Sequence, residues 1–252
     1  MSPADQTPRE VLSYVRLLAD ALRISSGQRL VGAYLHGSAA LGGWLPARSD
    51  VDLLLLLEGG GPAETLRGVE ETLVDSAAAC PGTGLECSVV LAGQAASPAP
   101  PWPFLLHVQS SPGQAVKPVR GDALEGDPDL LMHYAVCRVA GVPVFGPDPV
   151  AAIGPVPRDA ILAYLVDELD WGLAHGSEAY AVLNACRALV YAADGDLVSK
   201  ISGGRLAIDR HLGPADLIGR ALDEQRGEIP PGTIGAQATE FVRRVASTLR
   251  AL

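Results

Sequence analysis

Apolar residues along the first half of the chain occur in two patterns, helical spacing and short continuous runs. Residues 8–22 have apolar side chains every three or four positions, which is typical of an amphipathic helix. Residues 50–57 contain an unbroken aliphatic run, which predicts a strand buried on both faces of its sheet. Applied further, the two patterns predict strands over 30–36, 50–57 and 85–91, and helices over 8–22, 64–79 and 127–140.

The second half of the chain shows almost only helical spacing. The predicted helices span 158–175, 178–193, 214–225 and 235–252. Residues 141–157 contain five prolines and three glycines, and we place a domain boundary within them. The sequence therefore predicts an N-terminal domain of strands and helices over residues 1–153 and a helical domain over residues 154–252.

Composition and charge narrow the class of protein. Of the 252 residues, 48% are hydrophobic, which is typical of globular domains and not of disorder. The formal net charge of −10 repels phosphate backbones and disfavours nucleic acid as a partner. The same charge would attract a small cationic molecule, so we expect a small-molecule cationic partner.

Two further features bear on the compartment. Residues 1–9 are polar and lack the pattern of a signal peptide, and no apolar run reaches membrane-spanning length. The four cysteines have no paired spacing of the kind seen in zinc or redox motifs, so we expect reduced thiols. We therefore expect a cytoplasmic protein without a membrane partner.

The segment with the clearest chemistry is Leu35–Ser38, followed by Ser49–Asp52. In a strand, residues two apart point to the same face, so Asp50 and Asp52 would present adjacent carboxylates. Such a pair is costly to keep ionised without a cation, and hard oxygen ligands suit Mg²⁺. Gly37 and Ser38, at a strand end, can offer N–H groups and a hydroxyl to phosphate oxygens.

A third acid follows on the next strand. Glu86 interrupts the otherwise apolar stretch Leu85–Val90, and burying a carboxylate without a partner is costly. An isolated Asp-x-Asp is common by chance and usually means solvated acids or helix caps. The ordered set of strand, Gly-Ser turn, Asp-x-Asp strand and acidic third strand favours a metal site instead. His36, beside the turn, is expected to have a packing or hydrogen-bonding role at the strand end rather than to act as a catalytic base.

These motifs resemble those of a known family. The stretch HGSxxxGG…SDVDLLLLL resembles the signature of the DNA-polymerase-β-like nucleotidyltransferase superfamily, and is most similar to the streptomycin/spectinomycin adenylyltransferases, the aminoglycoside 3''-(9) nucleotidyltransferases. Residues 182–187 and 200–204 resemble a segment of that family's helical domain. The resemblance covers roughly residues 10–210. It implies an α+β fold, with a mixed sheet flanked by helices in the first domain and a helical bundle in the second.

The resemblance also implies an activity and its residues. The enzyme would use Mg²⁺ and ATP, transfer AMP to an acceptor hydroxyl and release pyrophosphate. Asp50, Asp52 and Glu86 would hold the metal, and Glu86 would act as general base. Residues implied to contact the nucleotide are Ser38, Ser49, Arg187 and Lys200.

The acceptor is less well defined. In the family, acids of the helical domain and an aromatic residue hold the cationic sugar, and Glu178, Asp170 and Trp102 are the candidates here. The register of these acids against Arg187 departs from the family pattern. The chain also has no tyrosine after Tyr191, where the family uses one near the base. These departures concern the substrate rather than the reaction.

Other acceptors stay open at this point. The same transfer to a different small molecule, or to a protein or a tRNA end, is the alternative to streptomycin or spectinomycin. The acidic charge disfavours tRNA, and the large helical domain disfavours a minimal protein-modifying enzyme. A nucleotide-binding module without activity would have no reason to keep three carboxylates. The oligomeric state cannot be predicted from this sequence.

Overall fold

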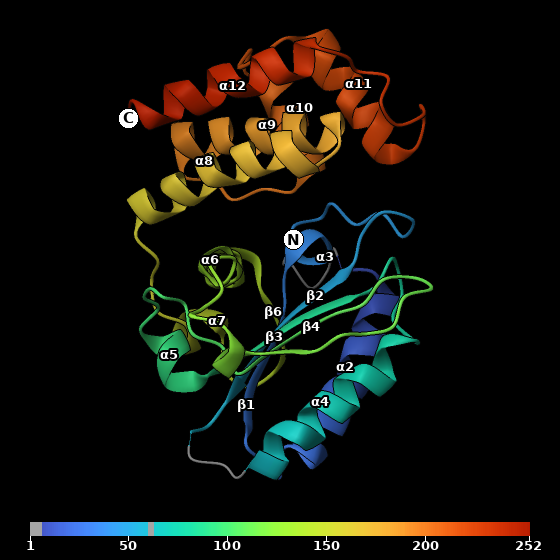
Figure 1. Cartoon of the computed structure of the whole chain (residues 1–252), viewed down its shortest axis with the longest axis vertical. Helices are drawn as coiled ribbons and strands as arrows, with labels where there is room; N and C mark the ends of the chain where they lie inside the picture. Colours follow the sequence, from blue (N-terminus) through green and yellow to red (C-terminus); the bar gives the residue numbers. More distant parts are fainter. Residues whose placement is uncertain (1–6, 60–62) are drawn as a thin grey trace. The chain divides into compact units, whose positions relative to one another are not determined.

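The computed structural model describes residues 7–59 and 63–252 of the chain. The polar residues 1–6 and the Gly-Gly-Pro stretch at 60–62 lie outside the described residues. The chain divides into two compact units, Met1–Val156 and Pro157–Leu252 (Figure 1). The boundary predicted from the sequence lies three residues before this division.

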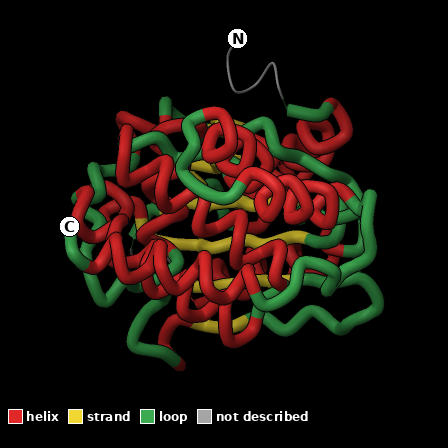
Figure 2. Tube along the Cα trace, turned by 90° about the horizontal axis from the view of Figure 1, so that it is seen from above, coloured by secondary structure: helices red, strands yellow, loops and turns green. Residues whose placement is uncertain are grey.

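The first unit contains a six-stranded sheet with the order β5-β4-β3-β2-β1-β6. Its central strands β2 and β3 are parallel, while the other neighbouring pairs are antiparallel. Figure 2 shows the strands running alongside one another. The mixed sheet, together with the helical second unit, confirms the predicted α+β class. The strands are β1 (Leu30–Leu35), β2 (Val51–Leu57), β3 (Leu85–Leu91), β4 (Leu106–Gln109), β5 (Val119–Arg120) and β6 (Val142–Phe145).

Strand β2 joins two hydrophobic cores on opposite faces of the sheet. Leu53, Leu55 and Leu57 belong to one cluster, which includes side chains of α2 (Arg9–Ser25) and α4 (Ala63–Ala77). Leu54 and Leu56 belong to the other, which includes side chains of α6 (Leu130–Ala140). Because successive side chains of a strand point to opposite faces, the continuous aliphatic run fits a strand buried on both faces.

The remaining helices of the first unit are short. They are α3 (Gly37–Ala40), α5 (Ala92–Ala96), α7 (Pro149–Ala152) and the 3₁₀ turn η1 (Gly121–Ala123). Strand β6 lies inside the proline-rich stretch that the sequence analysis treated only as a linker. Pro143 is compatible with this strand because β6 is at the sheet edge, where one side of the backbone needs no partner.

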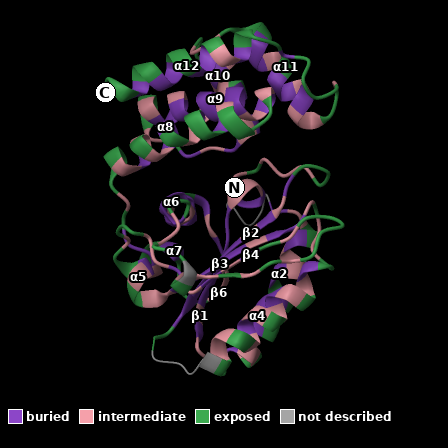
Figure 3. Cartoon of the chain, viewed as in Figure 1, coloured by how far each residue is buried: buried purple, intermediate pink, exposed green. Residues whose placement is uncertain are grey.

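The second unit, all of whose residues are described, is helical. Its helices are α8 (Arg158–His175), α9 (Glu178–Asp194), α10 (Lys200–Asp209), α11 (Ala215–Arg226) and α12 (Gln237–Arg250). Helix α9 has the most buried residues of the helices in this unit, and buried residues are purple in Figure 3. Ser177 caps its start by accepting a hydrogen bond from the Tyr180 N–H, and Gly195 ends it in the left-handed conformation.

Helix α10 was missed by the periodicity analysis because it contains the helix-weakening pair Gly203 and Gly204. Both glycines serve close packing. A Cβ on Gly203 would lie 2.9 Å from the Arg187 side chain, and one on Gly204 would lie 2.9 Å from the Leu183 side chain. The small residues therefore allow α10 to approach α9 closely.

The cysteines and the helices are the features that bear on the expected compartment. All four cysteines are free thiols, and Cys87, Cys137 and Cys186 are buried. Within the described ranges, no helix has the length and apolar character needed to cross a membrane. The cytoplasmic location stays a prediction.

The two-sided burial of β2 predicts a contrast between two leucine-to-alanine variants. Leu54→Ala removes a fully buried side chain and should lower the free energy of unfolding by about 2–5 kcal/mol. Leu17→Ala is the matched control: Leu17 is 73% exposed on α2, and its change should stay within about 0.5 kcal/mol. Urea unfolding followed by circular dichroism measures both. Equal losses would contradict the packing described here.

Candidate active site

Three carboxylates meet where β2 and β3 begin. Asp50 directly precedes β2, Asp52 is its second residue, and Glu86 is the second residue of β3. The parallel register pairs Asp52 with Glu86. The three residues each offer one carboxylate oxygen, and these oxygens lie within 4.8 Å of one another. The structure thus brings together the three acids that the sequence analysis assigned to a metal.

The electrostatics of this triad fit a cation. Burial, above all, and the negative charge of Asp50 raise the pKa of Glu86 to about 7, while His107 acts in the opposite direction. Carboxylates this close disfavour joint ionisation unless a positive charge is present. A hard divalent cation such as Mg²⁺ prefers oxygen ligands of this kind. The residues present therefore fit the metal that the sequence resemblance implied.

Gly37 lets the turn after β1 approach the triad. Its φ is +60°, and a Cβ at this position would lie 1.8 Å from Oδ2 of Asp52. The backbone N–H of His36 donates to the carbonyl of Asp52 over 3.0 Å. Any side chain at position 37 would therefore displace the Asp52 carboxylate.

The two predicted phosphate-binding serines differ in their surroundings. The Ser38 hydroxyl is buried and has no hydrogen-bond partner among the residues that the structure describes. A buried polar group of this kind usually has a partner, which a bound phosphate oxygen could supply. The Ser49 hydroxyl instead accepts a hydrogen bond from the Leu45 N–H over 3.0 Å. Ser49 thus closes the loop before Asp50, and its role toward phosphate stays a prediction.

A pair of histidines lies beside the triad. His133, on α6, has its Nε2 3.6 Å from Oε1 of Glu86. The ring of His36 packs on that of His133, with centroids 4.7 Å apart. Burial, above all, lowers the pKa of both imidazoles. The position of His133 could not be predicted from the sequence, because only the fold brings α6 to this end of β3.

In the second unit, Arg187 and Lys200 belong to one polar cluster. Nε of Arg187 donates to the Val198 carbonyl over 2.9 Å, and Nη1 donates to Oδ1 of Asn184 over 3.0 Å. The ammonium of Lys200 lies 4.5 Å from the centroid of the Tyr180 ring. Two cationic side chains that the sequence analysis assigned to the nucleotide are therefore linked through residues of α9.

Sequence reasoning did not assign three members of this polar cluster. The Tyr180 hydroxyl donates to the Glu168 carboxylate, and the Asn184 amide also donates to it, over 3.4 Å. Tyr180, Asn184 and Arg187 occupy positions i, i+4 and i+7 of α9, which places them on one helix face. This spacing of polar residues on an otherwise buried helix is the signal that could have identified them.

The residues predicted to hold the acceptor all have contacts within their own unit. Glu178 accepts hydrogen bonds from the N–H groups of residues 234 and 235, and Asp170 forms an ion pair with Arg250. Trp102 is partly buried against the core cluster beneath α6. Trp102 belongs to the first unit, whereas Glu178 and Asp170 belong to the second, and the role of all three toward an acceptor stays a prediction.

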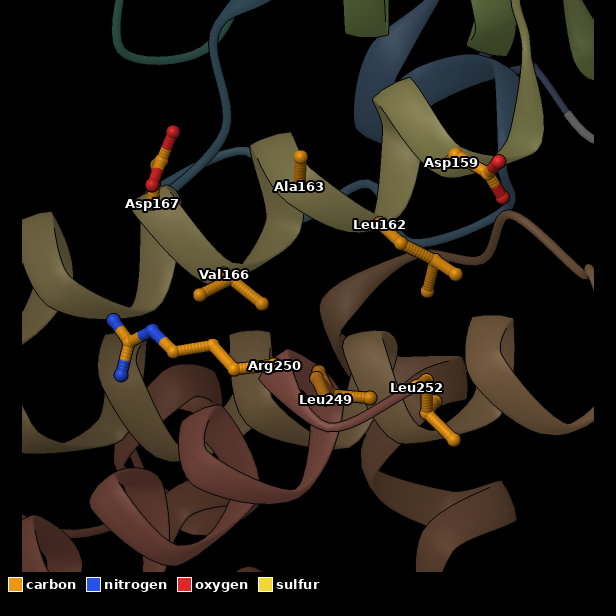
Figure 4. Close-up of a pocket in the computed structure, with 8 residues that line it drawn as sticks. All are labelled: Asp159, Leu162, Ala163, Val166, Asp167, Leu249, Arg250 and Leu252. Carbon is orange, nitrogen blue, oxygen red and sulfur yellow. The ribbon is translucent and has the colours of Figure 1, made fainter.

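A pocket of about 450 Å³ lies within the second unit. Figure 4 shows Leu162 and Val166 of α8 facing the end of α12, where Leu249 is located. The residues that line this pocket include none of the predicted site residues. This pocket is therefore not part of the candidate site, which consists of the polar groups described above.

Comparisons with known proteins agree with this geometry. Residues 152–248 match the family model of the aminoglycoside adenylyltransferase C-terminal domain, and residues 16–81 match that of the nucleotidyltransferase domain. No curated protein matches the sequence. The crystal structure of spectinomycin adenyltransferase AAD(9) from Enterococcus faecialis with ATP and spectinomycin is similar, with a TM-score of 0.72 and 14% identity. The match covers 94% of this chain and 98% of that one, so the two share a fold.

The close approach of Gly37 to Asp52 predicts the effect of adding a methyl group. Gly37→Ala should weaken Mn²⁺ binding by about tenfold or more, because Asp52 can no longer keep its position. Gly93→Ala is the matched control, since a Cβ there meets nothing within 4 Å. Calorimetric titration with Mn²⁺ measures both variants. Wild-type affinity in a folded Gly37→Ala protein would contradict the described site.

Proposed function

Because the chain belongs to the aminoglycoside adenylyltransferases of the nucleotidyltransferase superfamily, we propose that it transfers AMP from ATP to a hydroxyl of spectinomycin or streptomycin. The observation that carries this proposal is the carboxylate triad, whose oxygens lie within 4.8 Å of one another. The similar fold of an enzyme solved with ATP and spectinomycin supports the choice of nucleotide and acceptor.

Asp50, Asp52 and Glu86 are the residues that would hold Mg²⁺ in this proposal. Bound magnesium would activate the attacking oxygen and neutralise charge on the leaving pyrophosphate. The protein contributes the spacing of the ligands, which the paired register of Asp52 and Glu86 sets. It also contributes a turn at Gly37 that approaches the triad without a side chain.

Glu86 is the proposed general base. The acceptor oxygen forms a bond to the α-phosphorus, the bond from that phosphorus to pyrophosphate breaks, and the hydroxyl proton moves to Glu86. Without a bound cation its pKa is raised to about 7, so its surroundings favour the protonated form that this proton transfer produces. The neighbouring strands hold its backbone rigidly against β2.

The phosphate oxygens need donors and positive charge. The buried Ser38 hydroxyl supports a role as a donor to a phosphate oxygen. Arg187 and Lys200 are the proposed cationic contacts of the nucleotide, and Ser49 holds the loop that precedes Asp50. The orientation of Arg187 by Asn184 and Val198 supports this assignment, because a positioned guanidinium loses less freedom when it binds.

Spectinomycin and streptomycin are cationic, and the net charge of −10 favours their approach. Glu178, Asp170 and Trp102 are the proposed acceptor contacts. Because each already has a partner or a packing position, binding would have to compete with those contacts. Because these residues are proposed to contact the drug and not the nucleotide, their substitution should change the KM for the drug more than the KM for ATP.

The assigned base predicts a specific loss of activity. Glu86→Gln should lower drug-dependent pyrophosphate release by at least about 100-fold while largely retaining ATP binding, because the amide cannot accept the proton whereas Asp50 and Asp52 still hold the metal. Glu10→Gln, an exposed change on α2, should behave as wild type. Release is measured with ATP, Mg²⁺ and each drug separately. Full activity in Glu86→Gln would exclude its role as base.

The acceptor itself is tested with the wild-type protein in the same assay. Spectinomycin or streptomycin should stimulate pyrophosphate release, and deoxystreptamine aminoglycosides serve as comparison acceptors. If ATP binds with Mg²⁺ but neither drug stimulates release, the proposed acceptor is wrong. Other small molecules, a protein or a tRNA would then be the acceptors to test.

The assignment of Asp50 and Asp52 as metal ligands predicts that their substitution impairs ATP binding, the step before transfer. Asp50→Asn and Asp52→Asn should each reduce ATP binding to the level that the wild type shows in EDTA, because a neutral amide is a poorer ligand for Mg²⁺. Calorimetry with ATP, with and without Mg²⁺, separates the metal-dependent part. Wild-type magnesium dependence in both variants would contradict the metal assignment.

A further inference from the structure

The histidine pair beside the triad has no part in the reaction as described above. We propose that His133 is a positioning residue, which orients Glu86 by donating a hydrogen bond from Nε2 to Oε1, and that His36 fixes its ring. This inference rests on the proposed role of Glu86 as base. It assigns to His133 a function that depends on its N–H group rather than on its bulk.

The geometry places His133 close enough for this contact. Its Nε2 is 3.6 Å from Oε1 of Glu86, which is slightly longer than a hydrogen bond. Catalytic hydrogen bonds are often long in the absence of substrate and shorten when the complex forms. The His133 side chain is 12% exposed and comes from α6, a helix whose other side packs into the core. It is therefore held on a rigid element.

The two ring nitrogens of His133 are not equivalent. Within the described part of the chain, Nδ1 is buried and has no hydrogen-bond partner. A proton on Nδ1 would be a buried donor without an acceptor, which is costly, and would aim the lone pair of Nε2 at a carboxylate. A proton on Nε2 avoids both costs. The surroundings therefore favour the Nε2–H form, which can donate to Glu86.

His36 restricts the ring of His133 from the other side. It is 3% exposed, its ring is tilted by 42° to that of His133, and its backbone N–H donates to the Asp52 carbonyl over 3.0 Å. Because Asp52 is on β2, this bond ties the residue whose ring supports His133 to the strand that carries the metal ligand. With Oε1 directed at His133, the second oxygen of Glu86 is left for the acceptor hydroxyl or the metal.

Two substitutions separate positioning from packing. His133→Leu removes the donor and should lower kcat by about 10–100-fold with little change in the KM for ATP, as loss of an orienting partner does. His133→Gln places an amide N–H near the position of Nε2 and should keep most of the wild-type kcat. An unchanged kcat in His133→Leu, or an equal loss in a folded His133→Gln, would overturn the proposal.

A spectroscopic measurement tests the same point without turnover. In protein labelled with ¹⁵N-histidine, two-bond proton–nitrogen correlations identify the tautomer of His133, and His133→Gln assigns its signals. The expected result is the neutral Nε2–H form in the wild-type protein, and the Nδ1–H form would overturn the proposal. Because this readout needs neither ATP nor acceptor, it decides on His133 even if the proposed reaction proves wrong.

Discussion

The parallel pairing of β2 with β3 is the interaction on which the candidate site depends. It sets Asp52 directly opposite Glu86, so that two carboxylates from different segments lie side by side. Asp50 joins them from the residue before β2. A shift of the register by one residue would move one side chain to the opposite face of the sheet and separate the ligands. The position of the chemistry is therefore fixed by backbone hydrogen bonding.

The surrounding packing keeps that register in place. Leu53 and Leu55 fix β2 from one core, while Leu54 and Leu56 fix it from the other. Gly37 then brings the preceding turn against Asp52, and α6 brings His133 against Glu86. Placing partly buried acids together in this way raises the pKa of Glu86. The cost of the cluster is consistent with a site built for a cation.

The sequence predicted the features that depend on local pattern. The aliphatic run of β2 and the Asp50-x-Asp52 spacing identified the strand, the acids and the superfamily, and the family comparison supports that assignment. Strand β6 was not predicted because it contains a proline, which is acceptable there because β6 is at the edge of the sheet. Helix α10 was not predicted because it contains two glycines, which allow its close packing against α9. His133 was missed for another reason. Its neighbour Glu86 is remote in sequence, and no spacing rule relates a helix to a strand that tertiary folding places beside it.

In the proposed reaction, the triad serves transfer of the α-phosphoryl group together with its adenosine. The most direct measurement uses ATP labelled at the α-phosphate in one reaction and at the γ-phosphate in another, with Mg²⁺ and spectinomycin or streptomycin. We expect the α-label to become attached to the drug and the γ-label to leave as pyrophosphate. Transfer of the γ-label to the drug would contradict adenylyl transfer and identify a phosphotransferase instead.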